Sequence, residues 1–329
     1  MAMKNFRELS KTLSRIENRE EGSLALLKKF YAERKGASVL GITGLPGAGK
    51  STLVDQLIHL LRGQKKTVGV IAIDPSSPFT GGALLGDRVR MQRHATDEGV
   101  FIRSLGSRGA HGGLSRATHD ALVCLDAFGF DQIIVETVGV GQTELDIMGL
   151  ATTTVVVLVP ESGDTIQTIK AGLTEIADIF VVNKADREGA HSLQQMLQAM
   201  ITMGTTGGRG RTMDHGLGTI DHEKIMNDEP WTRGGDIPVL LTEANKCIGI
   251  AELWKSVLEH QTHLKNEPAH KQHQTAIRRK QFVEFCGEAF KEKIQKELET
   301  KKEWKTLVEK VAADKLNPYE ALEKILSCK

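Results

Sequence analysis

The chain has 329 residues, a length typical of two domains or of one large domain with extensions. Its 43 Lys and Arg balance 42 Asp and Glu, and the net charge of +1 gives no broad basic field for nucleic acid or an anionic membrane. Hydrophobic residues reach 40%, enough for a large core. The 33 glycines, against 10 Phe, 3 Trp and 2 Tyr, favour an α/β protein over an all-β sandwich.

Cysteine usage and hydropathy bear on the compartment. Cys124, Cys247, Cys286 and Cys328 are widely scattered without a CxxC pair, which indicates a reducing compartment rather than a disulfide framework. The first residues hold no apolar stretch of signal-peptide length, and the longest strongly apolar run, 155–159, is too short to span a bilayer. We expect a cytoplasmic chain that binds neither membrane nor nucleic acid.

The first part of the chain predicts short helices ahead of the main domain. Residues 4–35 are charged, with apolar side chains at helical spacing, for example Leu9, Leu13 and Ile16. We therefore expect an N-terminal helical extension over 1–36.

The middle of the chain alternates between two patterns. Apolar runs of strand length occupy 38–43, 67–73, 132–136, 153–159, 179–183 and 238–241, and helical patterns occupy 51–61, 114–128 and 191–203. Strands that are continuously apolar and separated by helices predict a mostly parallel sheet buried on both faces. We expect this α/β domain to cover 37–263. A glycine-rich stretch, 203–218, is expected to be a loop and has no assigned function.

After residue 264 only helical patterns follow. Phe282, Phe285 and Phe290 share one helical face, and Asn317 before Pro318 is typical of a helix start. Short amphipathic helices cannot bury their apolar stripes alone, so we expect 264–329 to be an extension that packs on the main domain or, as we favour, forms a dimer arm.

A phosphate-binding motif follows the first predicted strand. The segment from Gly44 to Ser51 reads Gly-Leu-Pro-Gly-Ala-Gly-Lys-Ser and fits GxxxxGK(S/T) between a strand and a helix, the context of a P-loop. Backbone N–H groups of such a loop surround phosphates. Lys50 would neutralise the β- and γ-phosphates, and the Ser51 hydroxyl would bind Mg²⁺. The motif predicts a nucleoside triphosphate site.

A second motif, Asn183-Lys184-Ala185-Asp186, follows the strand at 179–183 and selects the base. Guanine presents a ring N–H beside an exocyclic amine, and one carboxylate, Asp186, can accept from both. Adenine lacks this donor pair and would leave the carboxylate unpaired. The aliphatic part of Lys184 would cover the base, and Asn183 would tie this loop to the P-loop. The pair of motifs favours GTP over ATP.

Carboxylates at strand ends are candidates for Mg²⁺ and its waters. Asp74 ends one apolar run, Glu136 ends another, and Asp87 lies in a glycine-rich segment. Mg²⁺ needs only one or two carboxylates, so not all three are expected to be direct ligands. Gly139, three residues after Glu136, could donate its amide to a γ-phosphate.

Three segments closely resemble the MeaB/ArgK/MMAA family of GTPases, which act as chaperones of adenosylcobalamin-dependent methylmalonyl-CoA mutase. They are the run from Asp74 to Met91, the run Glu136-Thr-Val-Gly-Val-Gly-Gln142, and Asn183 to Asp186. The resemblance covers about residues 36–200. It implies a P-loop NTPase fold of the SIMIBI type, a C-terminal dimer arm, and Asp74, Asp87 and Glu136 as metal and water ligands.

The resemblance also implies a partner-dependent site. The segment 162–172 is similar to a switch loop through which the family contacts the mutase, and Gln167 and Lys170 match residues that approach the nucleotide in that complex. A lysine delivered to the γ-phosphate would stabilise charge as an arginine finger does. Lys50, Asp74, Gln167 and Lys170 are therefore the expected catalytic residues.

One departure concerns the guanine site. Where the family has a Ser-Ala pair, this chain has Leu241-Thr242-Glu243-Ala244, so Thr242 or the Ala244 backbone is the candidate substitute. The expected nucleotide contacts are Gly44, Pro46, Gly47, Ala48, Gly49, Lys50, Ser51, Thr52, Gly139, Asn183, Lys184, Asp186, Thr242 and Ala244.

The resulting hypothesis is a homodimeric, Mg²⁺-dependent GTPase that gates cofactor loading in an acyl-CoA mutase, with a cobalamin adenosyltransferase as a possible further partner. A first alternative is a kinase or ATPase linked to amino-acid transport, an activity attached to the ArgK name. A second is a metal-delivery GTPase, for which the pairs His260/His263 and His270/His273 could bind a metal, although no cysteine accompanies them.

Overall fold

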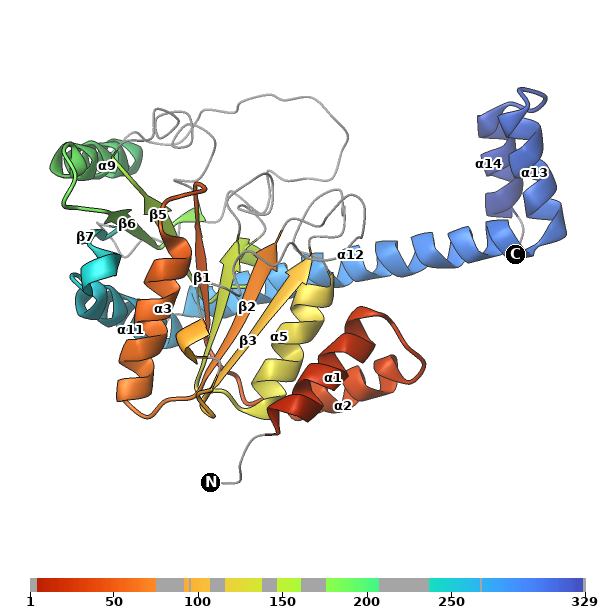
Figure 1. Ribbon diagram of the computed structural model, residues 1–329. Coiled ribbons are helices and arrows are strands. Elements are labelled where there is room, and N and C mark those ends of the chain that lie inside the picture. The colour runs from red at the N-terminus through yellow and green to blue at the C-terminus, as the bar shows by residue number, and fades with distance from the viewer. Residues whose placement is uncertain are drawn as a thin grey trace. The chain divides into compact units, whose positions relative to one another are not determined.

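The computed structural model describes residues 5–74, 92–94, 96–106, 116–137, 147–160, 176–206, 237–266 and 268–327. The chain divides into two compact units, Met1–Glu267 and Pro268–Lys329. The first unit contains a β-sheet with helices around it, and the second is helical (Figure 1).

The sheet of the first unit has seven strands, all parallel. In spatial order they are β3 (Val100–Gly106), β2 (Val68–Asp74), β4 (Gln132–Thr137), β1 (Val39–Gly44), β5 (Thr153–Leu158), β6 (Ile179–Asn183) and β7 (Val239–Thr242). This order confirms the predicted α/β fold class, with β1 at the centre. Since the strands are parallel, the carboxyl ends of β1, β2, β4 and β6 all meet at one edge of the sheet.

Six of the seven strands lie where the apolar runs predict them. The sequence analysis missed β3, in which Arg103 and Ser104 interrupt the apolar pattern. As an edge strand, β3 pairs with β2 alone. The Arg103 guanidinium donates to Glu17 Oε2 at 2.7 Å and to Ser14 Oγ at 3.1 Å, so its charge is satisfied by the N-terminal helix rather than by solvent alone.

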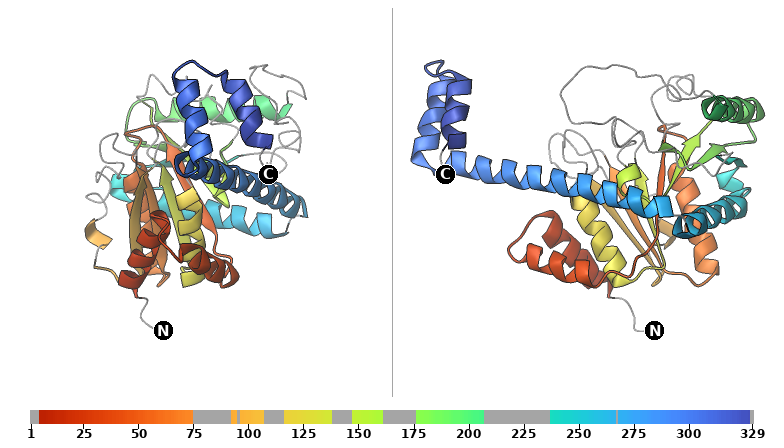
Figure 2. Two further views of the ribbon diagram at one scale, coloured as in Figure 1. Left: turned by 90° about the vertical axis from the view of Figure 1, so that its right-hand side faces the viewer. Right: turned by 180° about the vertical axis from the view of Figure 1, so that it is seen from behind.

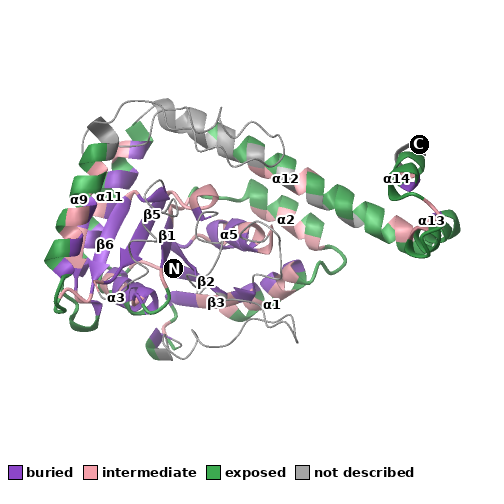
Figure 3. Ribbon diagram, turned by 90° about the horizontal axis from the view of Figure 1, so that it is seen from above, coloured by how far each residue is buried: buried purple, intermediate pink, exposed green. Residues whose placement is uncertain are grey.

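Helices cover both faces of the sheet, as the views in Figure 1 and Figure 2 show. On one face, α3 (Lys50–Gly63) and α11 (Ile250–Asn266) pack on Val155 and Val157 of β5 and on their neighbours. On the other, α9 (Ala190–Thr206) packs on Val156 and Leu158. Because successive residues of a strand face opposite sides, β5 must be apolar throughout, and the strands are the buried centre in Figure 3.

The N-terminal helices, α1 (Phe6–Glu17) and α2 (Ser23–Ala32), pack beside α5 (Arg116–Phe128) on the α9 side of the sheet. Leu9, Leu13 and Ile16 of α1 are buried in one cluster with Phe101 and Phe130. Residues of the predicted N-terminal extension therefore contribute to the main hydrophobic core.

Three short 3₁₀ turns complete the description of the first unit: η1 (Gln92–His94), η2 (Ile147–Gly149) and η4 (Ala244–Lys246).

No helix among the described ranges is both long enough and apolar enough to cross a membrane. Cys124, Cys247 and Cys286 are free, and burial raises the pKa of the Cys124 thiol to about 12, which keeps it protonated.

The second unit consists of α12 (Pro268–Thr300), α13 (Lys302–Ala312) and α14 (Pro318–Ser327). Asn317 Oδ1 accepts the Tyr319 N–H at 2.9 Å, which confirms the helix start predicted there. The expectation of short helices throughout is wrong for α12, which runs for 33 residues. No proline lies between its first residue and its end, and Lys, Glu and Gln favour continuation of a helix.

Candidate functional site

The P-loop connects β1 to α3. Gly44, Gly47 and Gly49 all have positive φ, at +134°, +76° and +89°. At Gly49 the reason is also steric, since a Cβ there would overlap the carboxamide nitrogen of Asn183. The loop therefore takes a conformation that L side chains disfavour, and the first helical residue, Lys50, follows at once.

Lys50 is folded into this loop. Its Nζ donates to the carbonyl oxygens of Gly44 at 2.8 Å and Leu45 at 2.9 Å, and its exposed fraction is only 6%. These two carbonyls hold the Lys50 ammonium against the start of the P-loop. Phosphate oxygens are stronger acceptors for an ammonium than neutral carbonyls, so a nucleotide can take over this cation.

Ser51 and Glu136 meet on the other side of the loop. Ser51 Oγ donates to Glu136 Oε1 at 2.6 Å, and both residues are buried. The strand register explains the meeting: Ile42 of β1 lies opposite Glu136 of β4, so the end of β4 reaches the start of α3. A hydroxyl and a carboxylate form a hard oxygen donor set, which fits Mg²⁺ rather than a softer transition metal.

Of the two other predicted metal ligands, the structure describes the position of Asp74 but not that of Asp87. Asp74 is the last residue of β2, at the same edge of the sheet as Glu136. Asp87 lies outside the described residues, as do Gly139, Gln167 and Lys170. Their assigned roles stay predictions.

A second carboxylate lies one helical turn after Ser51. Asp55 is buried, it forms an ion pair with Arg93 of η1, and its Oδ1 lies 3.0 Å from Nε2 of His94 in the same turn. Burial, followed by the nearby Arg93 charge, lowers the pKa of His94, so this imidazole is neutral at pH 7. The contact fixes η1 to the helix that begins at the P-loop.

Asn183, the last residue of β6, connects the two sequence motifs. Its Nδ2 donates to the Ala48 carbonyl at 2.8 Å, which is the expected tie to the P-loop. Its Oδ1 accepts from Thr242 Oγ1 at 3.0 Å and from the Ala244 N–H at 3.1 Å. One buried carboxamide therefore uses its donor on the P-loop and its acceptor on the loop after β7.

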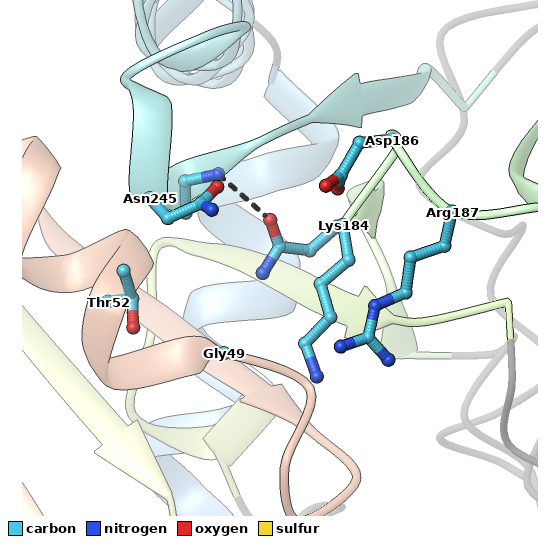
Figure 4. Close-up of a pocket in the computed structure, with 8 residues that line it drawn as sticks. Gly49, Thr52, Lys184, Asp186, Arg187 and Asn245 are labelled. Carbon is cyan, nitrogen blue, oxygen red and sulfur yellow. Dashed lines mark hydrogen bonds between the residues drawn. The ribbon is translucent and has the colours of Figure 1, made fainter.

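A pocket of about 160 Å³ lies between these loops. Its lining comes from the P-loop and α3, from the loop after β6, and from η4 (Figure 4): Gly49, Thr52, Asn183, Lys184, Asp186, Arg187, Ala244 and Asn245. Lys184 has φ +58°, a left-handed conformation uncommon outside glycine. The backbone at Lys184 is thus constrained at the point where a base would lie.

Asp186 is partly open to solvent in this pocket. Its Oδ2 lies 3.9 Å from Lys246 Nζ, while Lys246 donates to Glu243 at 2.7 Å. That hydrogen bond and the charge of Glu243 raise the pKa of Lys246, which is therefore protonated. Among the described residues, this distant cation is the one ion-pair partner of the Asp186 carboxylate, which can therefore accept hydrogen bonds from a ligand.

The two candidate substitutes for the family's Ser-Ala pair differ in position. Thr242 has an exposed fraction of 0% and its hydroxyl serves Asn183, so Thr242 supports the site without lining the pocket. Ala244 lines the pocket, but its N–H is also used by Asn183. The sequence analysis missed Asn245 and Arg187, which line the pocket beside the predicted residues.

The histidine pairs do not form a metal site among the residues with described side chains. His260 is buried on α11, with Nδ1 3.0 Å from Thr153 Oγ1 and Nε2 3.3 Å from Asp178 Oδ1. Across the described part of the chain, no group of three or more His, Cys, Asp or Glu could hold a metal ion. His260 thus connects α11 to the starts of β5 and β6, at the edge of the sheet opposite the pocket.

Comparisons with known proteins agree with this geometry. A family model described as methylmalonyl Co-A mutase-associated GTPase MeaB matches residues 9–315. A Pyrococcus horikoshii protein named as a GTPase is 44% identical over 322 residues, 97% of this chain and 93% of its own. The mouse mitochondrial methylmalonic aciduria type A homolog is 42% identical over 166 residues, 50% of this chain and 40% of its own. A crystal structure of an LAO/AO transport system kinase superimposes with a TM-score of 0.62 at 25% identity, covering 98% of this chain and 92% of that one.

Proposed function

The chain belongs to the MeaB family of methylmalonyl-CoA mutase-associated GTPases, and on that premise we propose that its GTP hydrolysis gates cofactor loading in an adenosylcobalamin-dependent acyl-CoA mutase, with methylmalonyl-CoA mutase as the first candidate. In this proposal the chain is a cytoplasmic homodimer that protects or reactivates the mutase. A cobalamin adenosyltransferase would supply the cofactor in the same assembly.

The observation that carries the nucleotide part is the position of Asn183 between the two motifs. Its hydrogen bond to Ala48 holds the loop that carries Asp186 at the P-loop that carries Lys50, which supports a single site made of both loops. Asp186 would accept from the guanine ring N–H and amine, and Lys184 would cover the base. This arrangement supports GTP over ATP as the substrate.

The proposed mechanism relies on positioning and charge. Lys50 would exchange its carbonyl acceptors for β- and γ-phosphate oxygens. Ser51 and Glu136, with Asp74 at the neighbouring strand end, would hold Mg²⁺ and its waters; the bound ion neutralises charge on the phosphates. In phosphoryl transfer the protein contributes mainly such stabilisation, so the isolated chain is expected to turn over slowly.

Partner dependence rests on the resemblance of the segment 162–172 to the family's switch loop. There Gln167 and Lys170 would reach the nucleotide only when the mutase is bound, and Gly139 would contact the γ-phosphate.

Lys50→Ala should abolish hydrolysis with or without the mutase. Lys170→Ala should keep basal turnover and lose the stimulation; equal losses in both assays would contradict this role.

The deciding experiment measures GTP and ATP hydrolysis by the purified protein, with and without methylmalonyl-CoA mutase. Slow turnover of GTP alone that rises when the mutase is added supports the proposal. Slow GTP turnover that is indifferent to the mutase would leave the GTPase and overturn the choice of partner.

The similarity to a protein named as an LAO/AO transport system kinase gives the second candidate, a kinase or ATPase linked to amino-acid transport. That function requires ATP and an acceptor for the phosphoryl group. In the same assay, ATP turnover exceeding that of GTP would favour it, and phosphate transferred to a protein rather than released to water would establish it.

A further inference from the structure

We propose that Asp55 is a positioning residue for GTP hydrolysis, because it holds residues 92–99 on the helix that begins at the P-loop. Arg93 is the cation that binds its carboxylate, and His94 is a second cation that takes over when Arg93 is absent. The inference deepens the proposed function and rests on the Mg²⁺ site that the proposal places at Ser51.

The first step is the place of Asp55 on α3. It follows Ser51 by four residues, so the two side chains lie on one face of the helix, with about 6 Å between their Cβ atoms. Ser51 is occupied with Glu136, to which its hydroxyl donates at 2.6 Å. The side chain of Asp55 is only 3% exposed. Burial strongly disfavours an unpaired charge, so this carboxylate needs a cation of its own.

The second step identifies that cation. Arg93 Nε donates to Asp55 Oδ1 at 3.1 Å, and Nη2 forms an ion pair with Oδ2, so the guanidinium meets both carboxylate oxygens. Arg93 is itself 63% exposed, whereas His94, whose Nε2 lies 3.0 Å from Oδ1, is 9% exposed. The carboxylate therefore has an arginine on its solvent side and an imidazole on its interior side.

The third step shows that the contact belongs to a longer attachment. Two turns after Asp55, the Arg62 guanidinium binds Asp97, with distances of 2.9 and 3.0 Å from Nε. Along α3 the acid precedes the base, and along 92–99 the base precedes the acid. We call these two ion pairs, Asp55–Arg93 and Arg62–Asp97, the α3 clamp. Their reversed order sets one register between the helix and the segment.

The fourth step concerns what the α3 clamp holds. Residues 92–99 lead directly into β3, which pairs with β2, the strand that ends at Asp74. In the sequence, η1 also follows the segment that contains Asp87, a predicted ligand outside the described residues. The clamp thus attaches the helix of Ser51 to the part of the chain that supplies the other predicted Mg²⁺ ligands. Asp55 supports the metal site without touching the ion.

The fifth step concerns the proton on His94. Among the described residues, the charged and titratable groups around it come from two elements: Asp55, His59 and Arg62 on α3, and Arg93 and Asp97 on its own segment. Burial first, and then the Arg93 charge, lower the pKa of His94, while the carboxylates favour its proton. Without Arg93, the imidazole faces Asp55 and can take up a proton between about pH 5 and 8.

The test is GTP hydrolysis by the full-length protein as a function of Mg²⁺ concentration, with thermal unfolding as the check on folding. At pH 8, Arg93→Ala should raise the Mg²⁺ concentration for half-maximal hydrolysis by about five-fold or more, because misplaced reacting groups slow a reaction steeply. GDP affinity in EDTA should stay within about two-fold of wild type, since the P-loop donors remain. Arg93→Lys keeps the charge without the paired contacts and should have a smaller effect.

The pH dependence separates positioning from a general loss of packing. At pH 6 protonated His94 neutralises Asp55, so Arg93→Ala should approach the wild type measured at the same pH. The double variant Arg93→Ala/His94→Asn lacks the second cation and should show the same deficit at pH 6 and pH 8. Arg7→Ala, at an exposed arginine of α1, is the matched control and should behave as wild type at both.

Three outcomes would contradict different parts of the argument. A folded Arg93→Ala protein with the wild-type Mg²⁺ requirement at pH 8 would overturn the positioning role of Asp55. Recovery at pH 6 in both variants, or in neither, would overturn the role of His94. Wild-type hydrolysis that does not depend on Mg²⁺ would instead overturn the metal site of the proposed function. The mutase is absent from all these assays, so the choice of partner is tested separately.

Discussion

At the scale of single residues, the side chain of Asn183 packs so closely against Gly49 that only glycine fits at position 49. Gly49 has no side chain because the Asn183 carboxamide occupies the place of its Cβ, and that carboxamide is needed on Ala48. The glycine of the P-loop thus allows the base-reading loop to approach. In the proposed function, phosphate binding and base selection would be coupled through this one contact.

Gly49→Ala is expected to weaken GDP binding by at least ten-fold and to lower stability by about 1–3 kcal/mol, because the new Cβ strains a left-handed backbone and displaces Asn183. The measurements are GDP affinity and thermal unfolding. Gly63→Ala, at the end of α3 with open space around its Cβ, is the control and should leave both unchanged or slightly improved. A Gly49→Ala protein that binds GDP normally would contradict the coupling.

The Asp97 carboxylate gives a prediction about pH. Hydrogen bonds from Arg62 at 2.9 and 3.0 Å, and from the Gly99 N–H at 2.7 Å, lower the pKa of Asp97 from its ordinary 3.8. A depressed folded-state pKa stabilises the protein above the ordinary value, and the contribution is lost as the pH falls through the lower one.

Asp97→Asn should therefore cost about 1–2 kcal/mol at pH 7, since the ion pair is only partly buried. The difference from wild type should shrink as the pH falls below 3.8. Urea unfolding at several pH values measures it, with Glu98→Gln, an exposed neighbour, as the control. A deficit independent of pH would show that lost packing, not charge, is responsible.

At the scale of elements, the linker between α2 and β1 is held by one side chain from α5. Asp126 accepts the N–H groups of Lys35, Gly36 and Ala37 at 3.1, 3.2 and 2.9 Å. Three backbone donors on one buried carboxylate fix the direction in which the chain enters β1. The N-terminal helices and the central strand are joined at this point.

Asp126→Ala should leave those three donors without their acceptor and cost about 1–3 kcal/mol. Faster hydrogen exchange at 35–37 and earlier proteolysis in the linker would report it. Asp126→Asn keeps Oδ1, which accepts two of the three N–H groups, and should have a smaller effect. Equal exchange rates in wild type and both variants would argue that the linker is held by other contacts.

At the scale of the whole molecule, the second unit leaves apolar side chains on α12 open to solvent. Phe282 and Phe290 are 67% and 63% exposed, and they lie eight residues apart on one helix. Exposed aromatic residues in such a row are typical of a surface that another chain covers. This feature supports the proposed homodimer, and 264–329 as its arm is our proposal.

Replacing Phe282 and Phe290 together with serine should convert a dimer in solution to a monomer, as measured by analytical ultracentrifugation. Basal GTP hydrolysis should be unchanged, because neither residue is part of the nucleotide site. Lys293→Ala, on the same helix, is the control. A wild-type protein that sediments as a monomer at micromolar concentration would exclude the dimer.

The sequence by itself determined the fold class and predicted the two halves of the site. Continuous Val and Ile runs predicted the buried parallel strands, and the motifs around Lys50 and Asp186 predicted their ligand chemistry, because both signals are local in the chain. The sequence did not predict the edge strand β3, because its polar residues, such as Arg103, form hydrogen bonds with a helix about 90 residues away in the chain.

Only the tertiary structure decided how the loops after β6 and β7 share their donors. Thr242 and Ala244 looked equivalent in the sequence, yet both serve Asn183, and Asn245 lines the pocket beside Ala244. Hydrogen-bond partners far apart in the chain are set by strand order and register. That is why spacing along the sequence predicted where a nucleotide binds but not which side chains join the two loops.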